Sequence, residues 1–201
     1  MKRIIVAISG ASGAIYGVRA LQVLQAVPEV ETHLIVSPSA KRTIVEETPF
    51  SVAEVEALAG VVHPHRDIGA SISSGSFRTA GMLVAPCSIK SLSGIVHSYD
   101  DNLLARAADV CLKERRTLVL LVRETPLHLG HLELLAQAAR YGAVILPPVP
   151  AFYNRPRTIA DLVDHTVGRA LDQFDIPHQL VKRWKEPAAA RAPAKGTAKL
   201  P

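Results

Sequence analysis

The sequence predicts an α/β fold in which a parallel β-sheet lies between two layers of helices, and three observations support this prediction. Short apolar runs rich in β-branched residues alternate with stretches of helical period, which is typical of βαβ units. With 48% hydrophobic and 20% charged residues, the 201-residue chain has a globular composition and can bury its own core. Its two cysteines are too few for a disulfide framework. We therefore expect one domain of ordinary size in a reducing compartment.

Five strands and seven helices are expected in alternation. The strands are the runs Ile4–Ile8, His33–Val36, Met82–Ala85, Leu118–Val122 and Ala143–Leu146. The helices are Ala14–Ala26, Ser39–Glu47, Ser51–Ala59, Ser88–His97, Asp101–Arg115, His131–Arg140 and Thr158–Phe174. Right-handed crossovers between parallel strands then give a three-layer α/β/α sandwich with a Rossmann-like (flavodoxin-like) sheet.

The formal charge of +5 does not indicate a nucleic-acid partner, because the excess lies at the end of the chain. Residues 182–201 hold six basic residues and one acidic residue, whereas residues 1–181 hold 17 of each. We expect a single domain over residues 1–186 and a flexible basic tail over residues 187–201. No apolar run reaches the roughly 18 residues of a membrane span, and the first one is too short for a secretory signal. A soluble, cytoplasmic protein is expected.

The residues that follow the strands predict an anion site, since ligands of open parallel sheets bind beyond the carboxyl ends of the strands. Small and polar residues follow four of the strands: Ser9-Gly10-Ala11-Ser12-Gly13, Ser37, Pro86-Cys87-Ser88 and Arg123-Glu124. The glycine spacing does not match a dinucleotide fingerprint, and there is no Gly-Lys-Ser/Thr run. A monophosphate such as FMN fits better, bound by Ser12, Ser37 and Ser88 with Arg123 as the counter-charge. The alternative is that these residues only form tight turns.

A second group of candidates is basic and aromatic: Arg106, Lys113, Tyr153 and Arg169. Arg106 and Lys113 are seven residues apart on one helix, so they share its polar face. Such a face is most often solvated, but burial against another subunit would turn it into a second phosphate site.

Two carboxylates are acid/base candidates, Glu124 at the ligand edge and Glu47 at a helix end. Three other signals receive little weight: a metal at His128, His131 and Glu133, a nucleophile at Ser12 and a reactive thiol at Cys87. No metal site is expected.

The motifs taken together resemble the UbiX-type flavin prenyltransferases. They are Gly10-Ala-Ser-Gly-Ala-Ile-Tyr-Gly17, Pro86-Cys-Ser-Ile-Lys-Ser-Leu-Ser93, Asp101-Asn-Leu, Arg106-Ala-Ala-Asp109, Leu112-Lys-Glu-Arg-Arg116, Arg123-Glu-Thr-Pro126 and Phe152-Tyr153. Each motif is weak alone, but their order along the chain up to Arg183-Trp184 makes the combination specific.

The resemblance implies transfer of a dimethylallyl group from dimethylallyl phosphate to FMN, first at N5 and then with ring closure at C6. The product, prenylated FMN, would serve a UbiD-type decarboxylase, in ubiquinone synthesis or in aromatic-acid breakdown. The family is metal-independent and forms homododecamers whose sites are shared between subunits. Whether the donor carries a monophosphate or a diphosphate stays open.

The resemblance also assigns roles to individual residues. The FMN-binding positions are Gly10, Ala11, Ser12, Ser37, Ser88, Ile89, Lys90, Ser91 and Arg123. Lys113, Tyr153 and Arg169 match positions that hold the dimethylallyl phosphate, with Arg106 and the Ser74-Gly75-Ser76 turn nearby. Ser12 and Glu124 match a proton-handling pair, and Glu47 matches a second acid.

Two other functions remain as alternatives. An FMN-dependent cysteine decarboxylase would share the fold, but it carries a Pro-x-Ser-x-Asn run where this chain has Pro86-Cys-Ser-Ile-Lys90, and it uses a histidine near the first helix that is missing here. A non-catalytic FMN carrier or accessory subunit of a decarboxylase would have no use for a second phosphate site.

Overall fold

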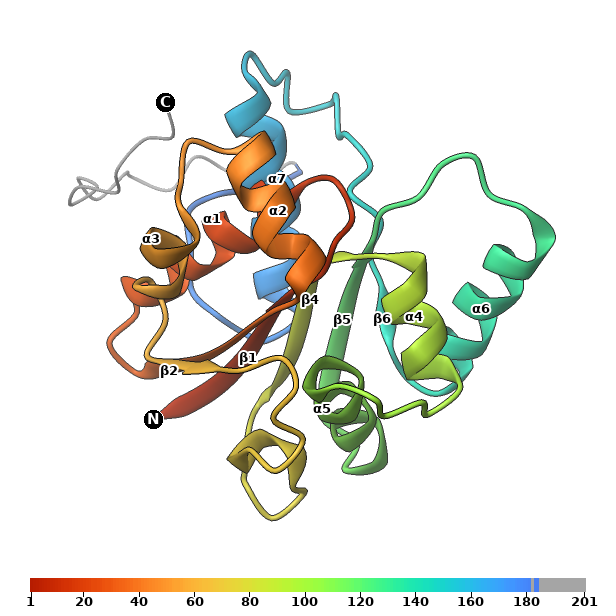
Figure 1. Cartoon of the computed structure of the whole chain (residues 1–201). Coiled ribbons are helices and arrows are strands. Elements are labelled where there is room, and N and C mark those ends of the chain that lie inside the picture. Colours follow the sequence, from red (N-terminus) through yellow and green to blue (C-terminus); the bar gives the residue numbers. More distant parts are fainter. Residues whose placement is uncertain (182, 185–201) are drawn as a thin grey trace.

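The computed structural model describes residues 1–181, 183 and 184, and in this part of the chain a six-stranded parallel sheet forms the centre (Figure 1). The strands are β1 (Lys2–Ile8), β2 (Val30–Val36), β3 (Val61–His63), β4 (Gly81–Cys87), β5 (Thr117–Val122) and β6 (Val144–Ile145). Their order is β3-β2-β1-β4-β5-β6, and all neighbouring pairs are parallel. The predicted tail of residues 187–201 lies outside the described residues.

Helices cover both faces of the sheet, which confirms the predicted three-layer α/β/α sandwich. One face is covered by α1 (Ala14–Gln25), α2 (Pro38–Glu47), α3 (Val52–Glu56) and α7 (Ile159–Asp172). The other face is covered by α4 (Ile89–Val96), α5 (Leu103–Lys113), α6 (Leu129–Arg140) and a 3₁₀ turn at Ser71–Ser73.

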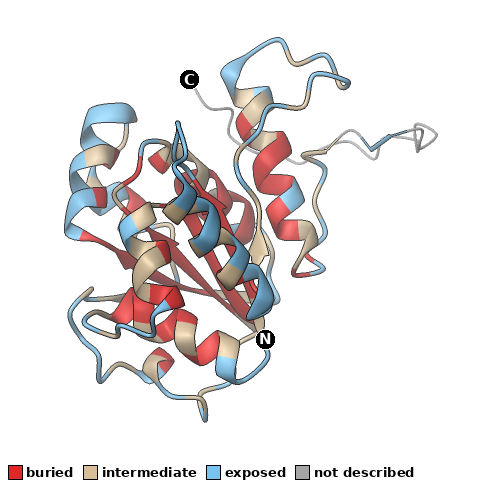
Figure 2. Cartoon of the chain, turned by 90° about the vertical axis from the view of Figure 1, so that its right-hand side faces the viewer, coloured by how far each residue is buried: buried red, intermediate tan, exposed pale blue. Residues whose placement is uncertain are grey.

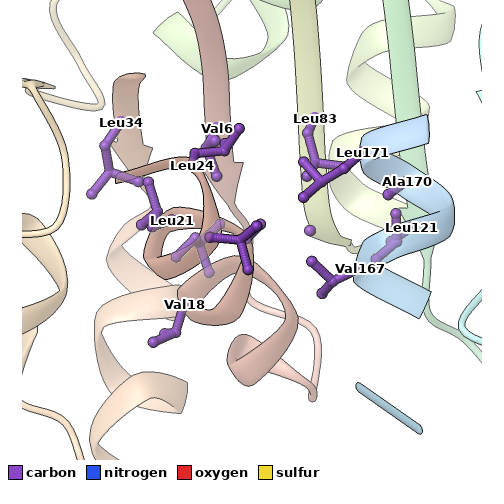
Figure 3. Close-up of a cluster of buried hydrophobic side chains, with 14 of the residues drawn as sticks. Val6, Val18, Leu21, Leu24, Leu34, Leu83, Leu121, Val167, Ala170 and Leu171 are labelled. Atoms are coloured by element: carbon purple, nitrogen blue, oxygen red, sulfur yellow. The ribbon is translucent and has the colours of Figure 1, made fainter. Parts of the chain in front are cut away.

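The core is split by the sheet because side chains of a strand point alternately to its two faces. Figure 3 shows Val6, Leu34, Leu83 and Leu121 from four strands packed against side chains of α1 and α7, among them Leu21. Figure 2 shows that the strands are buried throughout their central part, whereas the outer sides of several helices are exposed. Burial of a leucine or valine side chain contributes about 1.5–3 kcal/mol, so this double core accounts for most of the stability of the fold.

The structure corrects the predicted elements in two places. The short strand β3 and the 3₁₀ turn were not expected, because Val61–His63 is too short to show an alternating pattern. Strand β4 runs through Pro86 to Cys87, whereas a strand ending at Ala85 was expected. A register shift against β5 between Val84 and Cys87 accommodates the proline, which has no N–H to donate.

Candidate functional site

The strand order reverses between β1 and β4, and a ligand site of an α/β sheet is expected beyond the carboxyl ends of such a pair. Ser9, directly after β1, joins the two strand ends through its buried hydroxyl. Its Oγ donates to the Pro86 carbonyl oxygen at 2.8 Å and accepts from the Ser88 backbone N–H at 2.8 Å. The loop after β1 and the start of α4 are therefore held together at the edge where the two strands end.

Three helix N-termini meet at this edge, and their backbone N–H groups make it favourable for an anion. Ser37 is the N-cap of α2, with Oγ accepting from Ala40 N–H at 3.1 Å. Ser88 is the N-cap of α4, with Oγ accepting from Ser91 N–H at 3.3 Å and donating to the Ser91 hydroxyl at 3.1 Å. Ile89 and Lys90 occupy the first turn of α4, and the Lys90 side chain is exposed.

Helix α1 begins differently, because its N-cap is Gly13, which has no side chain to accept from the first N–H groups. Gly13 has a φ of 101°, a left-handed conformation that favours glycine. The Glu47 carboxylate takes the place of a cap: its Oε2 accepts from the N–H groups of Gly13 at 2.7 Å and Ala14 at 3.4 Å. An anionic oxygen therefore lies on the α1 N-terminus in this structure.

The loop that precedes α1 leaves no room for a side chain at Gly10. A Cβ placed on Gly10 would collide with Ser39 of α2, so the backbone of this loop packs directly against the start of that helix. Ala11 is nearly buried and Ser12 is exposed at the edge. These N–H groups, hydroxyls and the anion-holding α1 terminus fit the phosphate and polar edge of FMN. We call residues 9–13, Ser37, 88–91 and Arg123 the cradle.

Arg123 and Glu124 follow β5 and are exposed on the same edge. Burial raises the pKa of the Tyr16 phenol of α1, and the positive charge of Arg123 lowers it in part, so the two side chains interact electrostatically. The Glu124 carboxylate accepts from the Thr125 N–H at 3.0 Å. Ser12 and Glu124 follow strands that are two positions apart in the sheet, about 10 Å at the usual strand spacing. The partial burial expected for Glu124 is not supplied by the single chain.

The basic candidates Arg106 and Lys113 lie on α5 and are not part of the cradle. Arg106 donates to the Ser73 carbonyl oxygen at 3.1 Å and pairs with Asp100 at 3.1 Å and Asp109 at 3.3 Å. Lys113 Nζ lies 2.6 Å from a Glu114 carboxylate oxygen. The Ser74-Gly75-Ser76 turn lies next to Lys113, since a Cβ on Gly75 would lie 2.8 Å from Lys113 Nζ.

Lys113 lies at the opposite end of the sheet from the cradle. It precedes Thr117, the first residue of β5, whereas Glu124 follows Val122, the last one. Six strand residues at 3.3 Å each separate the two ends by about 20 Å. Lys113 and Glu124 of one chain therefore cannot act on one small molecule.

Tyr153 and Arg169 lie in a third region of the chain, at helix α7. The Tyr153 ring packs edge-on against His165 of α7, with ring centroids 5.7 Å apart, and against Trp184, with centroids 5.4 Å apart. Arg169 lies one turn further along α7 and pairs with Asp172 at 3.3 Å. The end of α7 lies at the amino edge of the sheet, where Lys2 Nζ donates to the Phe174 carbonyl oxygen.

Sequence reasoning missed three residues around these candidates: Tyr16, His165 and Asp172. The spacing of Arg169 and Asp172, three apart in a helical stretch, was a usable signal for an ion pair. Tyr16 and His165 gave none, because their importance depends on contacts between elements far apart in the sequence. Cys87 is fully buried and burial raises its pKa to about 12, which confirms that it is a packed residue.

His128 is the N-cap residue of α6, and its ring lies against that of His131 at a tilt of 33°, with centroids 3.5 Å apart. Over the described residues there is no cluster of three or more His, Cys, Asp or Glu side chains that could hold a metal ion. Within the same part of the chain, none of the helices is long and apolar enough to cross a membrane.

The chain matches the family model described as Flavoprotein over residues 1–183. It is 67% identical over 187 residues to the flavin prenyltransferase UbiX of Salmonella typhimurium, covering 92% of this chain and 99% of that protein. It is also 59% identical to the flavin prenyltransferase UbiX of Thauera aromatica, covering 90% of this chain and 93% of that protein.

Solved structures agree with this relationship. The dodecameric FMN-dependent Ubix-like decarboxylase of Escherichia coli O157:H7 superposes with a TM-score of 0.90 at 52% identity, covering 92% of this chain and 100% of the other. AnUbiX (PadA1), solved in complex with FMN and dimethylallyl pyrophosphate, gives a TM-score of 0.90 at 49% identity, with 92% and 98% covered. FMN-dependent cysteine decarboxylases such as SpaF, at 13% identity and a TM-score of 0.59, share the fold alone. This chain therefore belongs to the Flavoprotein family and, within it, to the UbiX-type flavin prenyltransferases.

Proposed function

We propose that this chain, a flavin prenyltransferase, joins a dimethylallyl group to N5 of reduced FMN and then closes a ring at C6, with the cradle of one subunit facing the phosphate-binding side chains of others. The observation that supports this arrangement is the geometry of the single chain: Lys113, one of the cations that would bind the second phosphate, lies about 20 Å from Glu124 along β5.

Residues 1–186 form the FMN-binding domain in this proposal. The N–H groups after Gly10 and Ala11, the hydroxyls of Ser12, Ser37 and Ser88, and the first turn of α4 up to Ser91 would hold the flavin, with Arg123 balancing its negative charge. Reduced FMN supplies a nucleophilic nitrogen and an aromatic face that stabilises an allylic cation.

Lys113, Tyr153 and Arg169 would hold the phosphate of dimethylallyl phosphate, with Arg106 beside them. Cleavage of the allylic C–O bond leaves negative charge on the phosphate, so fixed cations lower the barrier to departure. In the single chain the Lys113 and Arg169 side chains are each about half exposed. They are therefore available to a ligand at a subunit interface.

Glu124, with Ser12 on the same edge, would remove the proton that ring closure releases, since both residues are exposed at the edge of the sheet that follows the strands. Glu47 would be a second acid, and its carboxylate would leave the α1 N-terminus when a phosphate takes that position.

The proposed assembly is a homododecamer, as in the Escherichia coli O157:H7 structure, which is described as dodecameric. The recipient of prenylated FMN would be a UbiD-type decarboxylase. We place the enzyme in the cytoplasm, because its two cysteines, Cys87 and Cys111, are both free and buried.

One assay tests the activity and separates it from the alternatives. The purified protein is mixed anaerobically with reduced FMN and either dimethylallyl phosphate or the diphosphate, and the flavin is analysed by mass spectrometry. A prenyltransferase adds one C5H8 unit to the flavin. An unchanged flavin, with FMN binding demonstrated, would favour a flavin carrier; release of CO₂ from a cysteine peptide would favour a decarboxylase.

A further inference from the structure

The Asp172 carboxylate, in the last turn of α7, contacts three side chains that can carry positive charge. Arg183 makes a two-pronged contact, with Nη2 2.7 Å from Oδ1 and Nη1 3.1 Å from Oδ2. His178 Nε2 lies 3.0 Å from Oδ1, and Arg169 Nη1 donates to Oδ2 at 3.3 Å. One carboxylate thus holds two guanidinium groups and an imidazole.

Asp172 is well shielded, with 17% of its side chain exposed, and the His178 side chain is 1% exposed. The hydrogen bond from Arg183, followed by that from His178, lowers the pKa of the Asp172 carboxyl, so it is ionised at neutral pH. Its single negative charge is outweighed by the two arginines. The cluster therefore retains positive charge, which suits a phosphate ligand next to Arg169.

The same carboxylate fixes the chain that follows α7. His178 and Val181 lie against Gly168, where an added Cβ would come within 2.8 Å of the His178 ring. Arg183 is bound to Asp172, and the next residue, Trp184, packs on Tyr153. On its other side Tyr153 packs on His165. The Nδ1 atom of His165 is hydrogen-bonded to Nδ2 of Asn154 at 3.2 Å. Asp172 is thus connected both to Arg169 and, through Arg183 and Trp184, to Tyr153.

We propose that Asp172 is a positioning residue for the dimethylallyl phosphate site: it orients the Arg169 guanidinium directly and the Tyr153 ring through Arg183 and Trp184. This inference rests on the proposed role of Arg169 and Tyr153 in phosphate binding. A guanidinium on a flexible stem loses side-chain entropy when it binds an anion, and a fixed carboxylate partner reduces that loss. Asp172 itself does not touch the substrate.

The test compares Asp172→Asn with Asp164→Asn in the full-length protein. Asp164 is the matched control, since it is on the same helix and binds an arginine, Arg19 of α1, at 2.6 Å, and Arg19 is not among the proposed phosphate ligands. Asp172→Asn is expected to lower kcat/KM for dimethylallyl phosphate by roughly 10-fold to 100-fold, mainly through KM, with FMN affinity unchanged. Asp164→Asn should leave both constants near the wild-type values, and Asp172→Glu should recover much of the loss.

A double-mutant cycle of Asp172 and Arg169 distinguishes orientation of Arg169 by Asp172 from a general loss of stability. In an Arg169→Ala background, Asp172→Asn should raise KM much less than it does in the wild type, because the side chain that it orients is gone. An equal rise of KM in both backgrounds would overturn the proposal. An unchanged KM for Asp172→Asn in an active enzyme would overturn it as well.

A second readout does not depend on activity. Trp184 is the only tryptophan of the chain, so its fluorescence reports on the segment that Asp172 holds. Asp172→Asn should make this fluorescence more accessible to acrylamide and lower its anisotropy, whereas Asp164→Asn should not. If the wild type makes no prenylated flavin, the proposed function fails, and the fluorescence still reports whether Asp172 holds the segment. Unchanged fluorescence in Asp172→Asn would overturn the connection to Tyr153.

Discussion

The cradle and the basic group of Arg106, Lys113 and Arg169 present different groups to an anion. The cradle uses backbone N–H groups and hydroxyls at three helix N-termini, and these positions follow directly from the parallel strand–helix connections. The basic group uses long side chains, and each of them already pairs with a carboxylate of its own chain: Asp100 and Asp109, Glu114, and Asp172. The fold therefore determines the positions of the donor groups in the cradle, whereas the basic side chains would have to exchange a carboxylate partner for a phosphate.

If both proposed sites are real, this difference would let one domain bind two phosphates at separate positions. A cradle of N–H groups has a fixed shape and needs no rearrangement when its ligand binds. Paired cations avoid self-repulsion until a phosphate with more negative charge than one carboxylate draws them away. It also explains why the basic residues are scattered, since a site between subunits can take each residue from a different surface.

The largest expected effect is that of Glu124→Gln at the cradle. The variant keeps the shape of the side chain but cannot accept a proton, so adduct formation should fall by about 10²-fold to 10⁴-fold while FMN still binds. Mass spectrometry of the flavin measures the first quantity and titration of the apoprotein with FMN the second. Full activity in Glu124→Gln would remove this carboxylate from the mechanism.

A mixture of two inactive variants tests whether the two regions of different chains meet. Glu124→Gln is defective in the carboxylate next to the cradle, and Lys113→Met is defective in the basic group. If sites are shared between subunits, random co-assembly pairs an intact cradle with an intact basic group in about a quarter of the sites. Co-expressed, differently tagged chains should then recover about that share of the activity. No recovery in mixed oligomers would mean that the two residues act within one chain.

The cradle was largely predictable from the sequence, and the basic group was not. Gly10, Gly13, Ser37 and Ser88 follow strands whose pattern is local, so their meeting at one edge follows from parallel topology alone. No local pattern shows that Asp172 holds both Arg169 and Arg183, because the second contact depends on how the chain turns back after α7. The capping of α1 by Glu47, 34 residues away in sequence, is also invisible without the structure.

A smaller effect is expected for Ser88, which caps α4 and is also a proposed FMN ligand, and it distinguishes these two roles. Ser88→Ala removes the hydroxyl that caps α4 and should lower the free energy of unfolding by about 1 kcal/mol. Asn102→Ala is the matched control, since Asn102 caps α5 in the same way, accepting from Ala105 N–H at 3.1 Å. Both variants should lose similar stability in urea titrations, but only Ser88→Ala should weaken FMN binding. Equal FMN affinities would show that the Ser88 hydroxyl serves the helix alone.

The smallest effect concerns a histidine pair outside both regions, the buried His33 and the half-buried His63. Their titration contributes to any pH profile of the enzyme. His33 of β2 stacks on His63 of β3, with Nδ1 of His33 2.9 Å from Nε2 of His63. Burial lowers the pKa of His33 below its usual 6.5, and the neighbouring His63 lowers it further, although Glu31, 3.2 Å from His33 Nε2, acts in the opposite direction. Burial also lowers the pKa of His63.

Because the folded chain keeps His33 neutral, the unfolded chain binds more protons once the pH falls below about 6.5, the usual pKa of this side chain. The free energy of unfolding should therefore be fully retained above that pH and should decrease as the pH falls toward the lowered pKa of the folded state. His33→Gln removes this titration, so its stability should depend less on pH over the same interval, whatever its absolute value. Urea unfolding at several pH values measures the slope, and a slope equal to that of the wild type would assign the acid sensitivity to other groups. A loss of activity that follows the loss of stability as the pH falls would then be caused by unfolding. Only the pH dependence of activity that remains would be assigned to Glu124 and the cradle.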